Sequence, residues 1–139
     1  MKIKTGLTLF LFLSLFVRAQ KADSLILILK NIPESRKNNP EDTLECGILY
    51  YLARWNLVPK DLEVYTDRLK KETERKMGKL PAKHPLQKTL KKYLAFTYNE
   101  LGLRNRDKGN VAVALDYFNA AIRIFEELGL QSWIGTCSN

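Results

Sequence analysis

The chain has 139 residues, of which 45% are hydrophobic and 27% charged, and 23 Lys and Arg against 15 Asp and Glu give a formal charge of +8. This length allows a single domain, and the apolar content is that of a folded protein rather than a disordered one. One His and two Cys are too few ligands for a structural zinc site, and no residues have the spacing of a catalytic site. We therefore expect no metal, no cofactor and no enzymatic activity.

Residues 1–19 have the layout of a signal peptide. Two lysines precede an apolar stretch at residues 7–17, which is shorter than the roughly 20 residues that a membrane-spanning helix needs. The small residue Ala19 suits the position before a cleavage site, so we expect cleavage before Gln20 and export to the periplasm or the exterior. An uncleaved membrane anchor is the alternative. Cleavage would remove three cations and no acid, which lowers the charge from +8 to +5.

After Gln20 every strong hydrophobic period is helical, and no stretch alternates as a half-buried strand does. We expect an all-α fold with about five to six helices after the signal peptide. Residues 20–41 are expected to hold a short helix over 23–31, which Pro33 ends, and a polar linker over 35–40.

Two helices are expected between residues 42 and 80. The first begins after Asp42 or Thr43 and ends before Pro59, with a buried stripe of Leu44, Ile48, Leu52 and Trp55. The second begins at Pro59 and is closed by Gly78 and Pro81, with a stripe of Leu62, Tyr65, Leu69 and Met77.

A second pair of helices is expected over residues 85–128. The first of these begins at Pro85 and ends near Asp107, and Gly109 and Asn110 form the turn. The next has the strongest amphipathic pattern in the chain and is closed by Gly129; its apolar residues are Val111, Ala114, Leu115, Phe118, Ala121, Ile122, Phe125 and Leu128. Ser132 is expected to cap a last helix of barely two turns.

These pairs resemble each other and a known repeat family. Tyr51-Leu52-Ala53 recurs 42 residues later as Tyr93-Leu94-Ala95. The segment 95–126 resembles a tetratricopeptide repeat, in which the matching residues are Tyr98, Leu101, Gly102, Gly109, Asn110, Ala114, Leu115, Phe118 and Ala121. Small residues such as Gly102 and Ala114 let two helices approach closely, and Phe118 would fill the gap between them.

The resemblance implies stacked antiparallel hairpins, that is, an α-solenoid over residues 42–139. It divides this region into a degenerate repeat at 42–80, a clear repeat at 85–128 and the start of a further repeat at 130–139. Asn105 and Glu126 depart from the pattern, where an aromatic residue and Pro are usual. The run 121–136 is similar to the longer-unit variety that is typical of exported sensor regions of bacterial signalling proteins.

The family implies a module that binds a protein or peptide on a concave face lined by the helices expected at 42–58 and 85–107. Asn99 and Arg106 are our candidate groove contacts, and some of the aromatic residues would line the groove: Tyr50, Tyr51, Trp55, Tyr93, Tyr98 and Tyr117.

The alternative function is that of the sensory N-terminal part of a longer membrane signalling enzyme, a histidine kinase or nucleotide cyclase, whose output domain is absent here. We expect no nucleic-acid partner, and a membrane only as part of a longer anchored chain. Self-association would use the uncapped last helix, where Trp133, Ile134 and Cys137 would form an apolar edge.

Three further groups of residues are candidates for a site. A basic cluster is expected to be a solvated face, with an anionic partner or lipid headgroups as the alternative; it contains Lys70, Lys71, Arg75, Lys76, Lys79, Lys83, Lys88, Lys91 and Lys92. His84 is expected to be a loop residue at a helix entry rather than a general base. Cys46 and Cys137 are expected to be thiols, because helices two repeats apart are too distant for a disulfide.

Overall fold

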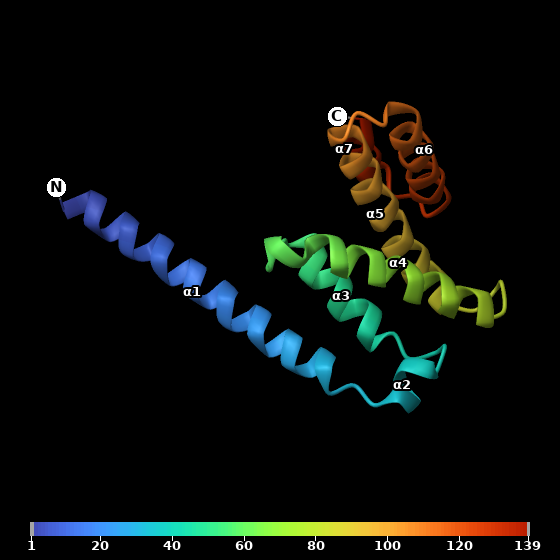
Figure 1. The fold of residues 1–139 in the computed structure, drawn as a ribbon, viewed down its shortest axis with the longest axis horizontal. Coiled ribbons are helices and arrows are strands. Elements are labelled where there is room, and N and C mark those ends of the chain that lie inside the picture. Colours follow the sequence, from blue (N-terminus) through green and yellow to red (C-terminus); the bar gives the residue numbers. More distant parts are fainter. Residues whose placement is uncertain (1, 139) are drawn as a thin grey trace.

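The computed structural model describes residues 2–138, with the side chains of Leu9, Leu11 and residues 13–134. Within this described part no strand occurs, so the expected all-α class is confirmed. The helices in chain order are α1 (Lys2–Lys30), α2 (Glu34–Asn38), α3 (Leu44–Arg54), a 3₁₀-helix η1 (Pro59–Asp61), α4 (Leu62–Lys79), α5 (Leu86–Asp107), α6 (Val111–Glu127) and α7 (Gln131–Ser138) (Figure 1).

Proline and glycine mark most of the helix boundaries. Pro59 opens η1, which leads directly into α4, and α5 begins immediately after Pro85. Gly109 and Gly129 have φ angles of 80° and 70°, a conformation that side chains other than glycine rarely adopt, and each follows the end of a helix. Gly78 was expected to close its helix but lies inside α4, which continues to Lys79. Likewise α7 begins at Gln131, so Ser132 is inside the helix rather than its cap.

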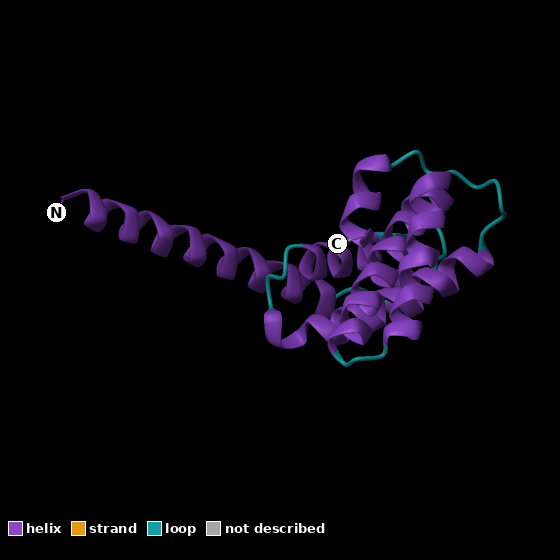
Figure 2. Ribbon diagram, turned by 90° about the horizontal axis from the view of Figure 1, so that it is seen from above, coloured by secondary structure: helices purple, strands orange, loops and turns teal. Residues whose placement is uncertain are grey.

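The N-terminal helix is longer than expected. α1 is continuous from Lys2 to Lys30, so the short helix expected over residues 23–31 is only its last part. The first half of α1 extends away from the other helices in both views (Figure 2) and carries exposed apolar side chains, among them Leu15, Phe16 and Val17. No described helix is long and apolar enough to cross a membrane. The linker expected at residues 35–40 contains the short helix α2.

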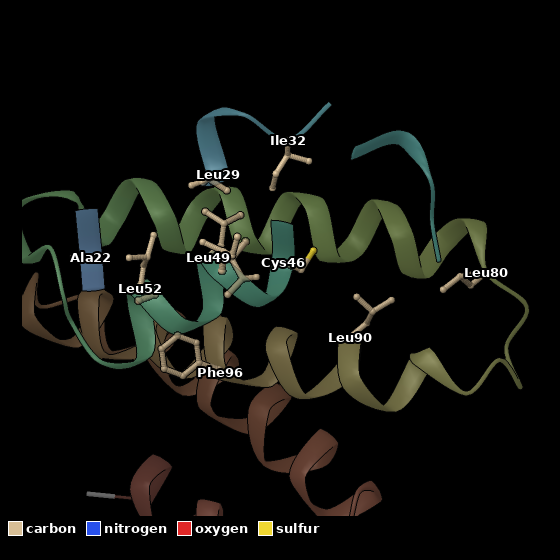
Figure 3. Packing of buried hydrophobic residues seen from close by; sticks show 12 residues of the cluster. Ala22, Leu29, Ile32, Cys46, Leu49, Leu52, Leu80, Leu90 and Phe96 are labelled. Atoms are coloured by element: carbon tan, nitrogen blue, oxygen red, sulfur yellow. The ribbon is translucent and has the colours of Figure 1, made fainter. Parts of the chain in front are cut away.

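The larger core surrounds α3. Helices α1, α4 and α5 all pack against it, so α3 is buried on more than one side rather than along a single stripe. Cys46, Leu49 and Leu52 of α3 meet Leu29 of α1 and Leu90 of α5 (Figure 3). The expected stripe is wrong at its end, because α3 stops at Arg54 and Trp55 is 57% exposed.

A smaller core lies between α5, α6 and α7, with Ala95, Ala121 and Phe125 at its centre. Trp133 and Ile134 of α7 are partly buried against this cluster, so the expectation that they form an uncovered apolar edge is wrong. The side chain of Cys137 lies outside the described residues. Val111 and Leu115 were expected on the buried face of α6, but both are exposed because they lie on the flank of the helix rather than toward α5.

Two charged side chains are buried in the larger half of the molecule. The ammonium group of Lys76 in α4 is fully buried and donates hydrogen bonds to the carbonyl oxygens of Lys37 (2.9 Å) and Asn39 (2.8 Å), at the end of α2. Lys76 was expected on a solvated basic face, and the structure corrects this. Glu45 at the start of α3 is also buried, and its Oε1 accepts hydrogen bonds from the Arg68 guanidinium of α4.

Candidate functional site

The residues that match the repeat signature meet where α5 packs against α6. A Cβ added at Gly102 would lie 2.5 Å from the Phe118 ring, so the two helices are as close here as only glycine allows. Leu101, Ala114 and Ala121 are buried, and Tyr98 packs against the same cluster. These side chains act in packing. Leu115 is the exception, since it points away from this contact and is exposed.

Cations and aromatic rings from three helices meet on one side of the protein. We call this set the cation–aromatic face: Tyr50 and Arg54 of α3, Lys92 of α5, and Trp133 of α7. The Arg54 guanidinium carbon lies 4.9 Å from the centre of the Trp133 ring, and the Lys92 ammonium lies 5.7 Å from it. Lys92 also lies 5.6 Å from the Tyr50 ring. All four side chains are partly exposed. Cation–π contacts of this kind hold the charges in fixed positions without neutralising them.

Neither cation of this face has an acidic partner among the described residues. Several other cations of the helical body do have one: Arg68 pairs with Glu45, Lys70 with Glu74, and Arg104 with Glu63 and Asp67. The Glu100 carboxyl interacts electrostatically with Arg54 but forms no ion pair within 4 Å with it. Burial raises the pKa of Glu100 above its ordinary value, while Arg54 and Arg104 oppose that rise. The face therefore keeps a positive charge.

Asn99 lies on the same side of α5 as Lys92, because seven residues make about two helical turns. Its Oδ1 is buried and accepts no hydrogen bond from any described residue. A buried acceptor without a donor costs free energy. Asn99 therefore holds a buried acceptor without a donor, on the Lys92 side of α5 and about two turns from Lys92.

Arg106 lies about two turns further along α5, where it pairs with Asp107. It helps to line a surface hollow of about 320 Å³ between the start of α4 and the end of α5, together with Leu62, Glu63, Thr66, Glu100, Leu103 and Arg104. The two candidate groove residues thus lie on one side of α5, and Asn99 is the nearer of the two to Lys92 along the helix.

The other aromatic candidates lie elsewhere. Tyr93 packs into the larger core, with its hydroxyl close to Gly47. Tyr98 and Tyr117 line a hollow of about 420 Å³ between α4 and α6. Tyr51 accepts a hydrogen bond from Lys21 of α1 and lies beside Trp55.

The expected basic face is not a uniform solvated surface. Arg75 pairs with Glu72 and Lys91 with Glu127, in addition to the burial of Lys76. His84 accepts a hydrogen bond from the backbone N–H of Leu86 at the start of α5, so it has the helix-entry position that was expected. Cys46 is a free, buried thiol, and burial raises its pKa to about 11.

The sequence pointed to part of the cation–aromatic face. Tyr50 was among the aromatic candidates and Lys92 was in the basic cluster, but Arg54 was not singled out and Trp133 was assigned to an edge. Among the described residues, no three His, Cys, Asp or Glu side chains are grouped so that they could hold a metal ion. No protein-family model matches this chain, and no similar protein was found among the curated proteins or the solved structures.

Proposed function

We propose that this protein is a tetratricopeptide-like module of stacked helical hairpins, which binds a protein or peptide and acts by that binding rather than by catalysis. The observation that carries the proposal is the cation–aromatic face. There, α3, α5 and α7 each contribute side chains that are only partly buried, and the two rings, Tyr50 and Trp133, pack against the cores from one side. Aromatic residues and Arg are the side chains most enriched at protein interfaces.

The packing of the helices supports this proposal. α3 packs against α4, α4 against α5, and α5 against α6. α3 also packs against α5, and Trp133 of α7 lies over cations from both. A repeated hairpin arrangement puts the first helix of each hairpin on a common side, which is the side on which such arrays bind their partners.

We also propose export from the cytoplasm, with residues 1–19 as the signal peptide. The distribution of burial in α1 supports this boundary. The described apolar side chains before residue 20 are exposed or only partly covered, whereas Ala22 and Leu29 are part of the larger core. Removal of residues 1–19 would leave the core contacts of α1 in place.

The binding proposal is tested by blocking the face sterically. A random-peptide array is probed with the protein purified after expression of the full chain, in a Cys137→Ser background. One sample carries Lys92→Cys labelled with a bulky polyethylene-glycol maleimide, and the control carries the same label at Lys71→Cys. Lys71 is exposed on the side of α4 opposite its buried residues. We expect a set of peptides that bind the control and lose binding when Lys92→Cys is labelled. Equal binding by both labelled proteins, or no binding at all, would contradict the proposal.

A further inference from the structure

We infer that the cation–aromatic face recognises acidic segments of its partner, so that carboxylate groups contact Arg54 and Lys92. This inference rests on the binding function proposed above and specifies the chemistry of the partner. It follows from the charges, the positions and the hydrogen-bonding capacity of the side chains that form the face.

The first step concerns charge. Arg54 and Lys92 are two positive groups from different helices, and neither forms an ion pair within 4 Å with a described carboxylate, although the Glu100 carboxyl interacts electrostatically with Arg54. Both are held near the same Trp133 ring, so their charges converge on one place. A partner segment with Asp or Glu residues would supply the missing negative charges, whereas a basic segment would be repelled.

The second step concerns the rings. Trp133 packs against Phe125 with ring centres 5.8 Å apart, and Tyr50 packs against Tyr93 and Phe96. Both rings are therefore anchored in the cores from one side, while they contact the cations from the other. A fixed ring limits the motion of Arg54 and Lys92, so less side-chain entropy is lost when a carboxylate binds them.

The third step concerns the unused acceptor. Oδ1 of Asn99 lies on the Lys92 side of α5 and lacks a donor. Because this oxygen is buried, a backbone N–H of an extended acidic segment would reach it only with a rotation of the Asn99 side chain, which would give the oxygen the donor that it lacks in the free protein. The face would then take carboxylates at its cations and a backbone N–H at Asn99, which favours a peptide over a free anion.

The test measures binding of a short fluorescein-labelled peptide of alternating Glu and Ala residues by fluorescence anisotropy. Peptides with Gln or with Lys in place of Glu serve as probes of charge. We expect the Glu peptide to bind best, the Lys peptide not to bind, and the affinity for the Glu peptide to fall as salt is raised. Equal binding of the Glu and Gln peptides would overturn the inference.

The variants locate the binding. Arg54→Gln and Lys92→Gln each keep a long polar side chain without its charge, and we expect each to weaken binding of the Glu peptide on the order of tenfold. Lys92→Arg keeps the charge and should restore most of the affinity. Lys71→Gln removes a charge from the outer side of α4 and should leave the affinity unchanged. If Lys71→Gln weakens binding as much as Lys92→Gln, the effect is one of net charge and the inference fails.

The array experiment separates failure of this inference from failure of the binding function. Peptides that lose binding when Lys92→Cys is labelled, but that are not enriched in Asp and Glu, would leave the binding function intact and overturn the acidic preference. Peptides that lose binding and are enriched in Asp and Glu would support both.

Discussion

Gly102 and Phe118 are in direct contact across the interface of α5 and α6. A Cβ built on Gly102 would lie 2.5 Å from Cε1 of the Phe118 ring and 2.6 Å from Cδ1, closer than real Cβ atoms are found. The ring is partly buried against Ala95, Ala121 and Phe125. It therefore cannot move away without disturbing the smaller core, and the spacing of the two helices depends on the absence of a side chain at residue 102.

The first prediction is that Gly102→Ala destabilises the protein by about 1–3 kcal/mol through overpacking, measured by urea unfolding followed by circular dichroism. Gly78→Ala is the matched control, because a Cβ at that helical position meets nothing within 4 Å. Its better helix propensity should stabilise the protein by up to ~1 kcal/mol. Adding Phe118→Leu to Gly102→Ala should recover part of the loss by making room for the methyl group. If Gly102→Ala and Gly78→Ala changed the free energy of unfolding by the same amount, the close contact between Gly102 and Phe118 would be contradicted.

The second prediction concerns the buried ammonium group of Lys76. Lys76→Met keeps most of the side-chain volume but removes the donors to the carbonyl oxygens of Lys37 and Asn39. We expect a loss of about 1–3 kcal/mol, since the carbonyl oxygen of Asn39 loses its donor in a partly buried place. The carbonyl oxygen of Lys37 keeps a donor in this variant, because the Arg75 guanidinium also donates a hydrogen bond to it. The change is measured by urea unfolding.

Lys71→Met on the same helix is the control, because that side chain is exposed, and its effect should be within about 0.5 kcal/mol. Hydrogen exchange of the α2 amides gives a local readout. Exchange should become faster in Lys76→Met and stay unchanged in Lys71→Met. Unchanged exchange at α2 together with unchanged stability would show that Lys76 does not hold α2 in place.

The positions of the helices could largely be predicted from local residue chemistry. Pro59, Pro85, Gly109 and Gly129 act on the backbone of their own segment, so their effect does not depend on the rest of the fold. Burial was predicted less well, because it depends on which helices surround each one. The sequence of α3 predicts one apolar stripe, but α1, α4 and α5 cover this helix on several sides. The charged residue Glu45 is therefore buried along with the apolar residues.

The candidate site depends still more on tertiary structure. Arg54 and Trp133 are far apart in sequence, and they meet only because the packing of α7 against α6 brings the Trp133 ring within reach of the Arg54 side chain. No periodicity in either helix carries that information. The same is true of Lys76, whose neighbours in sequence are the solvated charges of α4, while its hydrogen-bond partners lie almost 40 residues earlier. Asn99 and Tyr50 could be named in advance because the resemblance to tetratricopeptide repeats assigned their segments to the helices that would line the groove.

The third prediction concerns Arg68 and Glu45. Glu45 is buried, its Oε1 accepts hydrogen bonds from Arg68, and its Oε2 has no partner among the described residues. Arg68→Met would leave a buried carboxylate without its cation, so we expect a loss of about 3 kcal/mol at neutral pH. Adding Glu45→Gln should recover much of this loss, because the charge is removed with its partner. A double variant as unstable as Arg68→Met would show that the pair is not coupled.

The fourth prediction is a loss of stability at high pH that comes from Cys46. Burial raises the pKa of this thiol from its ordinary value of 9.0 to about 11. Below about pH 9 the thiol is protonated in both the folded and the unfolded chain, so its contribution is fully present. Between about pH 9 and 11 the unfolded chain loses the proton while the folded chain retains it, which favours unfolding by up to ~1.4 kcal/mol per pH unit.

The measurement compares this protein with its Cys46→Ala variant, both with Cys137→Ser, because other residues also titrate in this pH range and their effects cancel in the comparison. The free energy of unfolding of each protein is measured with urea at several pH values. The difference between the two free energies should shift in favour of Cys46→Ala as the pH rises from 9 to 11. A difference that stays constant over this range would show that the folded structure does not keep the thiol protonated.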